Sequence, residues 1–385
     1  MRKTEVDMFG SSLEQQAIEA VRAMEEEMMS PETTDNPETE MQYYNMSRGI
    51  FNAIDRKFTL LNSDTCRGAN VDILILVPSR PGSAHTRAAI RSTYGKLSSD
   101  RIAAVNNVQL TKVVRVLFLT GTTSNMTQLT WVHNENKNFQ DVIETEVEDT
   151  YYNLTAKILH GLKWVTLNCP DVKFLVKADE DVFINVIELV RQLVKFESSD
   201  TDIVLGTIQA RSKHTWVHRD GRWGVPYNVY PLTSYPPYAQ GNCYILSGTL
   251  LPKIIETAPY FPYLPIEDAF ITGILAVKLH HARLINLKRN ARWLWYDVVP
   301  DPCKFVMFKY ISSSNMSPHN MNTVWNILLH QNFTICDKKY HRVRQWMNTW
   351  HWMKRVMIAV CAWYCGLLES AVWTSTADFS SLCFL

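Results

Sequence analysis

Apolar runs and helical repeats alternate along the middle of this chain. Short runs of consecutive apolar residues, typical of strands buried on both faces, occupy residues 71–77, 113–119, 172–177 and 203–206. Apolar positions spaced as on one face of a helix occupy residues 84–94, 154–165 and 183–194. This alternation predicts an α/β fold with a mostly parallel central sheet and helices on both faces.

A cluster of acids follows one of the predicted strands. Asp179, Glu180 and Asp181 follow residues 172–177 with only Ala178 between them, at the carboxyl end of the strand, where open α/β sheets bind ligands. Three adjacent carboxylates repel one another unless a cation neutralises them. Their oxygens suit Mg²⁺ or Mn²⁺, which could in turn hold a diphosphate. A solvated acidic turn that caps the next helix is the alternative.

Five sequence blocks in fixed order carry a resemblance to a known family. The chain resembles the β-1,3-galactosyltransferase and β-1,3-N-acetylglucosaminyltransferase family (glycosyltransferase family 31) at residues 87–95, 148–157, 177–185, 235–247 and 265–273. Three departures from the family pattern are Glu180 in place of Asp, Tyr94 in place of Trp, and Ala269-Phe270 in place of Val-Tyr. Glu180 keeps a charge and two oxygens, so the acidic cluster is retained, and Glu180→Asp is expected to be tolerated.

The resemblance implies both a fold and a reaction. The fold would be of the GT-A nucleotide-sugar type. The reaction would be an inverting transfer of galactose or an N-acetylhexosamine from a UDP-sugar, with Mn²⁺ as cofactor. The acceptor would be the 3-hydroxyl of a sugar on a glycoprotein or glycolipid, and the product a β-1,3 linkage.

The matching positions suggest roles for individual residues. Asp181 and Asp179 are implied as metal ligands, and the residues implied at the donor site are Lys177, Asp179, Glu180, Arg87 and Arg91. Arg87 and Arg91 lie one helical turn apart and share a face, from which they could bind uridine or phosphate. Pairing of either arginine with a structural carboxylate is the alternative.

The acceptor hydroxyl must lose a proton as it attacks. The resemblance implies Asp268 as the general base, with Glu267 as its neighbour. Both acids precede a helix-like run at residues 270–279, so simple helix capping is the alternative.

Charge and composition narrow the choice of partners and compartment. A net charge of +1 over 385 residues gives no reason to expect a nucleic-acid partner. None of the eight cysteines has the C-x-x-C spacing of a zinc site. Asn-x-Ser/Thr sequons begin at Asn45, Asn125, Asn153, Asn315 and Asn332. With the family resemblance, these features suggest a Golgi protein with a luminal catalytic domain, disulfides and glycans. Asn153 belongs to a family block, so a structural role is its alternative.

The two ends of the chain differ from the family pattern. Residues 1–50 read as a disordered acidic lead without an apolar anchor, residues 51–336 as the catalytic domain, and residues 337–385 as an atypical basic and apolar tail. The apolar run 356–368 is shorter than the roughly 20 residues that span a bilayer. Membrane association is therefore expected through a segment that is missing or atypical here.

Two other function classes stay open. A non-catalytic carbohydrate-binding protein derived from such an enzyme would explain Glu180 and the absent anchor. A metal-dependent phosphohydrolase could use the same acids, but it needs further grouped ligands, and the pair His280-His281 looks incidental.

Overall fold

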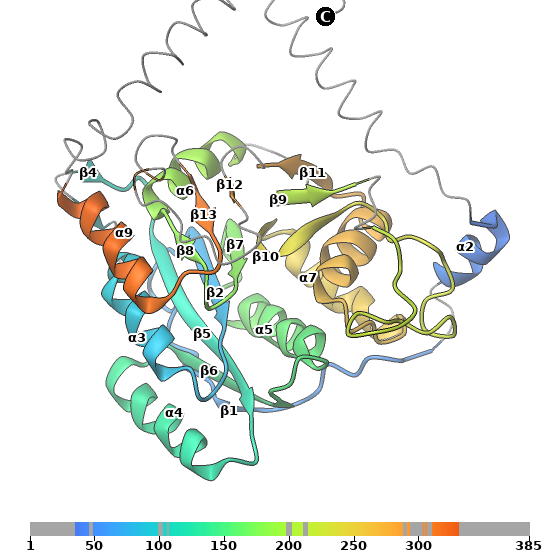
Figure 1. Cartoon of the computed structure of the whole chain (residues 1–385), viewed down its shortest axis with the longest axis horizontal. Coiled ribbons are helices and arrows are strands. Elements are labelled where there is room, and N and C mark those ends of the chain that lie inside the picture. The colour runs from blue at the N-terminus through green and yellow to red at the C-terminus, as the bar shows by residue number, and fades with distance from the viewer. Residues whose placement is uncertain are drawn as a thin grey trace, which may run out of the picture. The chain divides into compact units, whose positions relative to one another are not determined.

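The computed structural model describes most of the chain between residues 35 and 330. The described residues are 35–45, 49–98, 103–105, 108–197, 202–210, 215–287, 291–292, 303, 305 and 310–330 (Figure 1). The chain divides into two compact units, residues 1–330 and 331–385. The described residues do not include the predicted tail with its apolar run, or Asn332. They also do not include residues 1–34 of the predicted lead. Among the helices that are described, none is long and apolar enough to cross a bilayer.

The main sheet of the described part contains eight strands in the order β1-β6-β5-β2-β7-β10-β9-β11. Their bounds are β1 Phe58–Leu60, β2 Ile73–Pro78, β5 Val114–Thr122, β6 Val142–Glu148, β7 Phe174–Ala178, β9 Ile203–Gln209, β10 Tyr238–Ser247 and β11 Arg283–Asn286. The central strands β6, β5, β2 and β7 are mutually parallel, whereas β10 runs antiparallel to both β7 and β9. The predicted α/β class with a mostly parallel centre is confirmed. Small ladders join β3 (Ala104–Val105) to β4 (Val108–Gln109), and β12 (Ala291–Arg292) to β13 (Ser312–Ser313).

Two apolar layers cover the two faces of the sheet, as strand alternation requires. Along β2, Ile73, Ile75 and Val77 belong to one layer, and Leu74 and Leu76 belong to the other. The first layer packs against α3 (Ala84–Ser92), α4 (Met126–Phe139), α6 (Val186–Leu193) and α9 (Pro318–His330). The second packs against α5 (Leu154–Asn168), α7 (Leu250–Thr257) and the wide, π-type helix η4 (Ala269–Leu279) (Figure 1). Helices on both faces are therefore confirmed.

One helix begins later than its apolar spacing predicts. Phe183 and Ile184 form strand β8, which pairs with β13, and α6 starts only at Val186. Asn185 separates the two elements, because its side chain accepts a hydrogen bond from the Glu188 amide and caps the helix. The turn that holds the acids is thus fixed on both sides by strands.

Part of the predicted disordered lead is ordered. Helix α2 (Pro37–Tyr43) has Asn36 as its N-cap and Pro37 in its first turn. Its last residue, Tyr43, is 2% exposed and packs edge-on against Tyr230. Apolar burial of this one ring, which overall composition did not indicate, anchors the helix.

A disulfide between Cys66 and Cys169 joins the segment before β2 to the end of α5. Cys303 is also disulfide-bonded, and Cys243 is a buried free thiol. Disulfides form and persist in oxidising compartments. The expectation that some cysteines pair is confirmed.

Candidate active site

The acidic cluster lies where the direction of the sheet connections reverses. From β2, the chain crosses over to β5 on one side, and β7 pairs with β2 on the other side. Ligands of open α/β sheets bind outside the carboxyl ends of the strands at such a point. Two loops meet there: residues 79–83 after β2 and residues 179–182 after β7.

The three acids of the cluster have different surroundings. Asp179 is 40% exposed and accepts a hydrogen bond of 2.6 Å from the ammonium of Lys177. Asp181 is half-buried, and burial, followed by the nearby Asp179 carboxylate, raises the pKa of Asp181. Glu180 points to the neighbouring loop, where Ser79, Arg80 and Ser83 donate to it. Asp179 and Asp181 are therefore the two acids of the turn that have no such loop partners.

A buried lysine connects this turn to the second pair of acids. Lys177 is 1% exposed, and its ammonium donates to Asp179 and to the Gly241 carbonyl, and lies 3.6 Å from Glu267. Burial alone would lower the pKa of Lys177, but the carboxylates of Asp179 and Glu267 raise it above its usual value. Lys177 therefore keeps its charge and fixes Asp179 at the strand end.

Glu267 is buried, at 4% exposure, and its carboxyl accepts a hydrogen bond of 2.5 Å from the Tyr244 hydroxyl. Burial raises the pKa of Glu267 to about 7, although the Lys177 ammonium opposes this shift. Of the two interactions with Lys177, the 2.6 Å contact of Asp179 is closer than the 3.6 Å contact of Glu267. Asp179 is therefore the closer counter-charge of the lysine.

Asp268 follows directly and is held by two backbone amides. One carboxylate oxygen accepts from the Gly241 amide at 2.8 Å, and the other accepts from the Ala269 amide at 2.9 Å. Burial raises the pKa of Asp268, and those two amides oppose the shift. The second bond is a helix cap on η4, so the capping alternative is observed. Each oxygen still has a further lone pair that could accept a proton.

Gly241 is required for this close approach. A Cβ on Gly241 would lie 3.0 Å from an oxygen of Asp268. The same residue gives its carbonyl to Lys177 and its amide to Asp268. The backbone of β10 therefore links the two pairs of acids, and sequence reasoning had not identified this link.

Both predicted donor-site arginines pair with carboxylates inside the protein. Arg87 is fully buried and donates twice to Glu135, at 2.9 and 2.7 Å, and its other N–H groups bind the 79–81 loop. Arg91 donates to Glu135 and, twice, to Asp141. The structural pairing that the sequence left open is thus observed for both. Contact of either arginine with a donor stays a prediction.

The carboxylates of Asp179 and Asp181 suit a hard divalent cation whose remaining ligands come from a bound molecule. Among the described residues, no group of three or more His, Cys, Asp or Glu side chains is arranged to hold a metal alone. Mg²⁺ and Mn²⁺ are commonly held by one or two carboxylates together with phosphate oxygens. Burial, and after it the neighbouring Asp179 carboxylate, raises the pKa of Asp181, and a bound cation would offset the repulsion between the two carboxylates.

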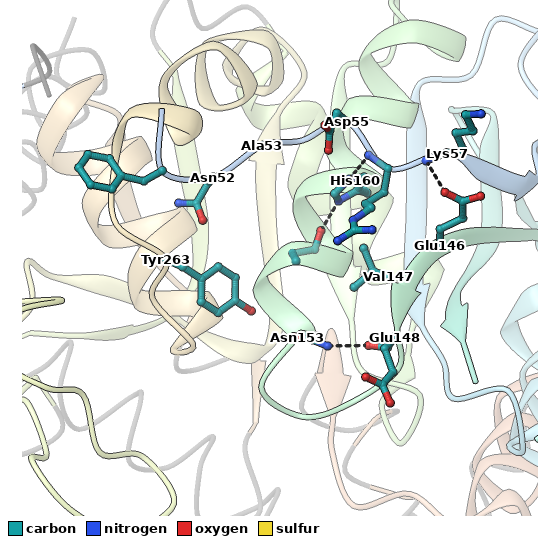
Figure 2. Close-up of a pocket in the computed structure, with 13 residues that line it drawn as sticks. Asn52, Ala53, Asp55, Lys57, Glu146, Val147, Glu148, Asn153, His160 and Tyr263 are labelled. Carbon is teal, nitrogen blue, oxygen red and sulfur yellow. Dashed lines mark hydrogen bonds between the residues drawn. The ribbon is translucent and has the colours of Figure 1, made fainter. Parts of the chain in front are cut away.

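A polar cavity of about 1000 Å³ lies beside the first turns of α5. Figure 2 shows its lining from residues 51–57, the end of β6, α5 and Tyr263. There the side chain of Asn153 donates to the Glu148 carbonyl at 3.1 Å. The structural role proposed for Asn153 from the sequence is therefore observed.

The aromatic residues between β9 and η4 divide into two groups. Tyr230, Tyr235 and Tyr238 are buried and belong to the core. Trp216, Trp223 and Tyr227 are at least half exposed, and the Trp223 indole donates to the Tyr151 hydroxyl at 2.9 Å. The Trp223 ring, held in this way, offers an apolar face of the kind that suits the face of a sugar.

Comparison with known proteins adds a family and several relatives. A family model described as galactosyltransferase matches residues 85–286. Human beta-1,3-galactosyltransferase 2 is 27% identical over 76% of this chain and 67% of its own length. Mouse UDP-GalNAc:beta-1,3-N-acetylgalactosaminyltransferase 1 is 29% identical over 71% of this chain and 80% of its own length. Human beta-1,3-galactosyltransferase 5 is 31% identical over 56% of this chain and 66% of its own length.

Proposed function

Because the chain belongs to the galactosyltransferase family, we propose that it moves galactose or an N-acetylhexosamine from a UDP-sugar to the 3-hydroxyl of an acceptor sugar, with inversion to a β-1,3 linkage. Relatives named for galactosyl and N-acetylgalactosaminyl transfer support this reaction class. The acceptor is a glycan on a protein or a lipid.

One observation carries the proposal. Lys177 and Gly241 hold Asp179 and Asp268 in a single hydrogen-bonded network at the ligand-binding edge of the sheet. A transferase of this kind needs a charge-neutralising site for the leaving diphosphate and a base for the incoming hydroxyl. The network supports both in one place.

We assign the roles as follows. Asp181 and Asp179 would hold Mn²⁺, which when bound neutralises the charge that develops on the leaving UDP. Lys177 orients Asp179. Asp268 accepts the proton of the acceptor hydroxyl as the hydroxyl oxygen bonds to the sugar C1 and the C1–O bond to the diphosphate breaks. Glu267 lies beside Asp268 and is the second candidate for the base.

The donor is tested by a release assay. The purified protein with Mn²⁺ is given UDP-galactose, UDP-N-acetylglucosamine or UDP-N-acetylgalactosamine, and UDP is measured. We expect one donor to release UDP at least ten times faster than the others, and the release to stop in chelator. Equal release from all three donors in the presence of chelator would contradict a metal-dependent, donor-selective site.

We propose the Golgi lumen as the compartment in which the protein acts. The Cys66–Cys169 disulfide and the exposure of the sequon asparagines Asn45 and Asn125 support this proposal. Asn315 is also exposed, but the next residue, Met316, donates to the backbone of Asp181, so a glycan there would stand beside the donor site.

Glycosylation provides the test of compartment. Expressed in a secretory system with a supplied signal, the protein should lose mass on enzymatic deglycosylation. Asn125→Gln should reduce the mass lost on deglycosylation by one glycan. Asn153→Gln should leave the lost mass unchanged, because the Asn153 side chain is hydrogen-bonded to the Glu148 carbonyl. An unshifted mass together with freely titrating Cys66 and Cys169 thiols would exclude a luminal protein.

A further inference from the structure

We propose that Glu180 is a positioning residue, which fixes the 79–83 loop as one wall of the donor site, and that it is not a metal ligand. The inference rests on the proposed function, since it concerns the site in which that reaction would take place. Its basis is the set of contacts that the Glu180 carboxylate makes across the gap between the ends of β7 and β2.

Four donors from a single loop surround the Glu180 carboxylate. One oxygen accepts from Arg80 Nε and from Ser83 Oγ, both at 2.9 Å. The other accepts from Ser79 Oγ at 2.8 Å and from the Arg80 amide at 3.2 Å. The side chain is only 14% exposed, so water takes little part in these contacts.

These contacts use the whole acceptor capacity of the carboxylate. A carboxylate offers about four lone-pair positions, and the loop occupies all of them. A metal at Glu180 would have to displace at least one of these hydrogen bonds. Among the described residues, the hydrogen bonds of the other two acids go elsewhere: Asp179 accepts from Lys177, and Asp181 accepts from the backbone of Asp181 and Asn315. Of the three acids, Glu180 is therefore the one that is bonded to the 79–83 loop.

A second residue holds the same loop from the other side. Arg87 donates to Ser79 Oγ at 3.0 Å, to the Arg80 carbonyl at 2.7 Å and to the Pro81 carbonyl at 3.2 Å. Its remaining N–H groups bind Glu135 on α4. Hydrogen bonds therefore run from Glu180 through Ser79 and Arg87 to Glu135, and the loop lies between two charged side chains of opposite sign.

The length of the Glu180 side chain matters for this role. An aspartate is shorter by one methylene, about 1.5 Å, and cannot keep four contacts of 2.8–3.2 Å on a loop that Arg87 holds in place. The sequence alone suggested that Glu180→Asp would be tolerated. The contacts lead to the opposite expectation, which distinguishes a positioning residue from a metal ligand.

The test compares Glu180→Asp and Glu180→Gln with Glu256→Asp, a matched change at an exposed position on α7. UDP affinity is measured at saturating Mn²⁺, together with kcat, the Mn²⁺ requirement and Tm. Hydrogen exchange of the 79–83 peptide is followed in the ligand-free protein. We expect both Glu180 variants to expose the Arg80 amide to exchange and to weaken UDP binding roughly 10-fold, about the net contribution of one hydrogen bond. The kcat at saturating donor should stay within about threefold, and Glu256→Asp should change nothing.

A double-mutant cycle adds specificity. Ser83→Ala should weaken UDP binding by itself, and its effect should largely vanish in a Glu180→Ala background, because both changes remove the same contact. Multiplicative effects of the two changes would overturn the proposal. So would wild-type UDP affinity in Glu180→Asp despite a looser loop, or a Glu180→Asp variant in which only the Mn²⁺ requirement shifts. If the wild-type protein binds no UDP at all while the loop still responds to Glu180, the proposed function itself fails and the donor-site role falls with it.

Discussion

Replacing Asp268 by Asn should lower kcat by about 10²–10⁴-fold and leave UDP affinity near the wild-type value. The proposed proton transfer occurs only in the transition state, so its loss affects turnover and not donor binding. Asn cannot accept that proton, although it is nearly the same size and caps a helix about as well as Asp.

The Asp268 carboxylate accepts two hydrogen bonds from backbone amides, so the stability of the Asp268→Asn variant has to be measured as well. Asn can still accept from the Ala269 amide, but its NH₂ group would face the Gly241 amide, which now donates to a carboxylate oxygen. Loss of that bond is worth about 1–3 kcal/mol. Tm must therefore be followed beside kcat, so that the fall in kcat is measured on folded protein.

Glu267→Gln is the matched control for this variant. Burial raises the pKa of the Glu267 carboxyl to about 7, which would suit a general base. However, Glu267 is 4% exposed and already bonded to the Tyr244 hydroxyl. We expect kcat of Glu267→Gln to fall less than 10-fold. Normal turnover of Asp268→Asn with a dead Glu267→Gln would reverse the two assignments, and normal turnover of both would leave Asp268 as a helix cap only.

Asp181→Ala should reduce transfer at least about 10³-fold, because a metal that stabilises the leaving diphosphate contributes several kcal/mol to the transition state. The change keeps the backbone carbonyl that accepts from Met316, so the turn should stay folded. Calorimetric titration with UDP, with and without Mn²⁺, should show metal-dependent binding in the wild type and none in the variant.

Asp171→Ala, at an exposed position in the loop before β7, is the control for a general loss of negative charge, and it should bind UDP normally. Full activity of Asp181→Ala, or full activity of the wild-type protein in chelator, would rule out the metal assignment.

The strands that position the site could be predicted because burial on both faces leaves a clear sequence pattern. Residues 71–77 and 172–177 read as strands and form β2 and β7. The acids followed from their place after the second of these strands. Their environment could not be predicted, because it depends on partners far away in sequence. Ser79 and Glu180 are 101 residues apart, and no local pattern pairs them.

The arginines show the same limit. Their spacing on one helix face suggested that they could bind uridine or phosphate, with a structural carboxylate as the alternative. Both pair with Glu135, which lies on α4, 48 residues from Arg87, and which the sequence pattern did not single out. The apolar spacing placed Phe183 and Ile184 in a helix, but they form a strand, because they pair with β13, more than 100 residues later in the chain.

The most direct test of the account is the structure of the transferred product. The protein is incubated with Mn²⁺, the donor selected by the release assay, and acceptors that end in a β-linked galactose or N-acetylglucosamine, and the product is analysed by NMR. The account predicts one new glycosidic bond, β in configuration and at the 3-hydroxyl. An α-linked product, a bond to another hydroxyl, or Mn²⁺-dependent UDP binding without transfer to any acceptor would contradict it, and the last result is what a non-catalytic carbohydrate-binding protein would give.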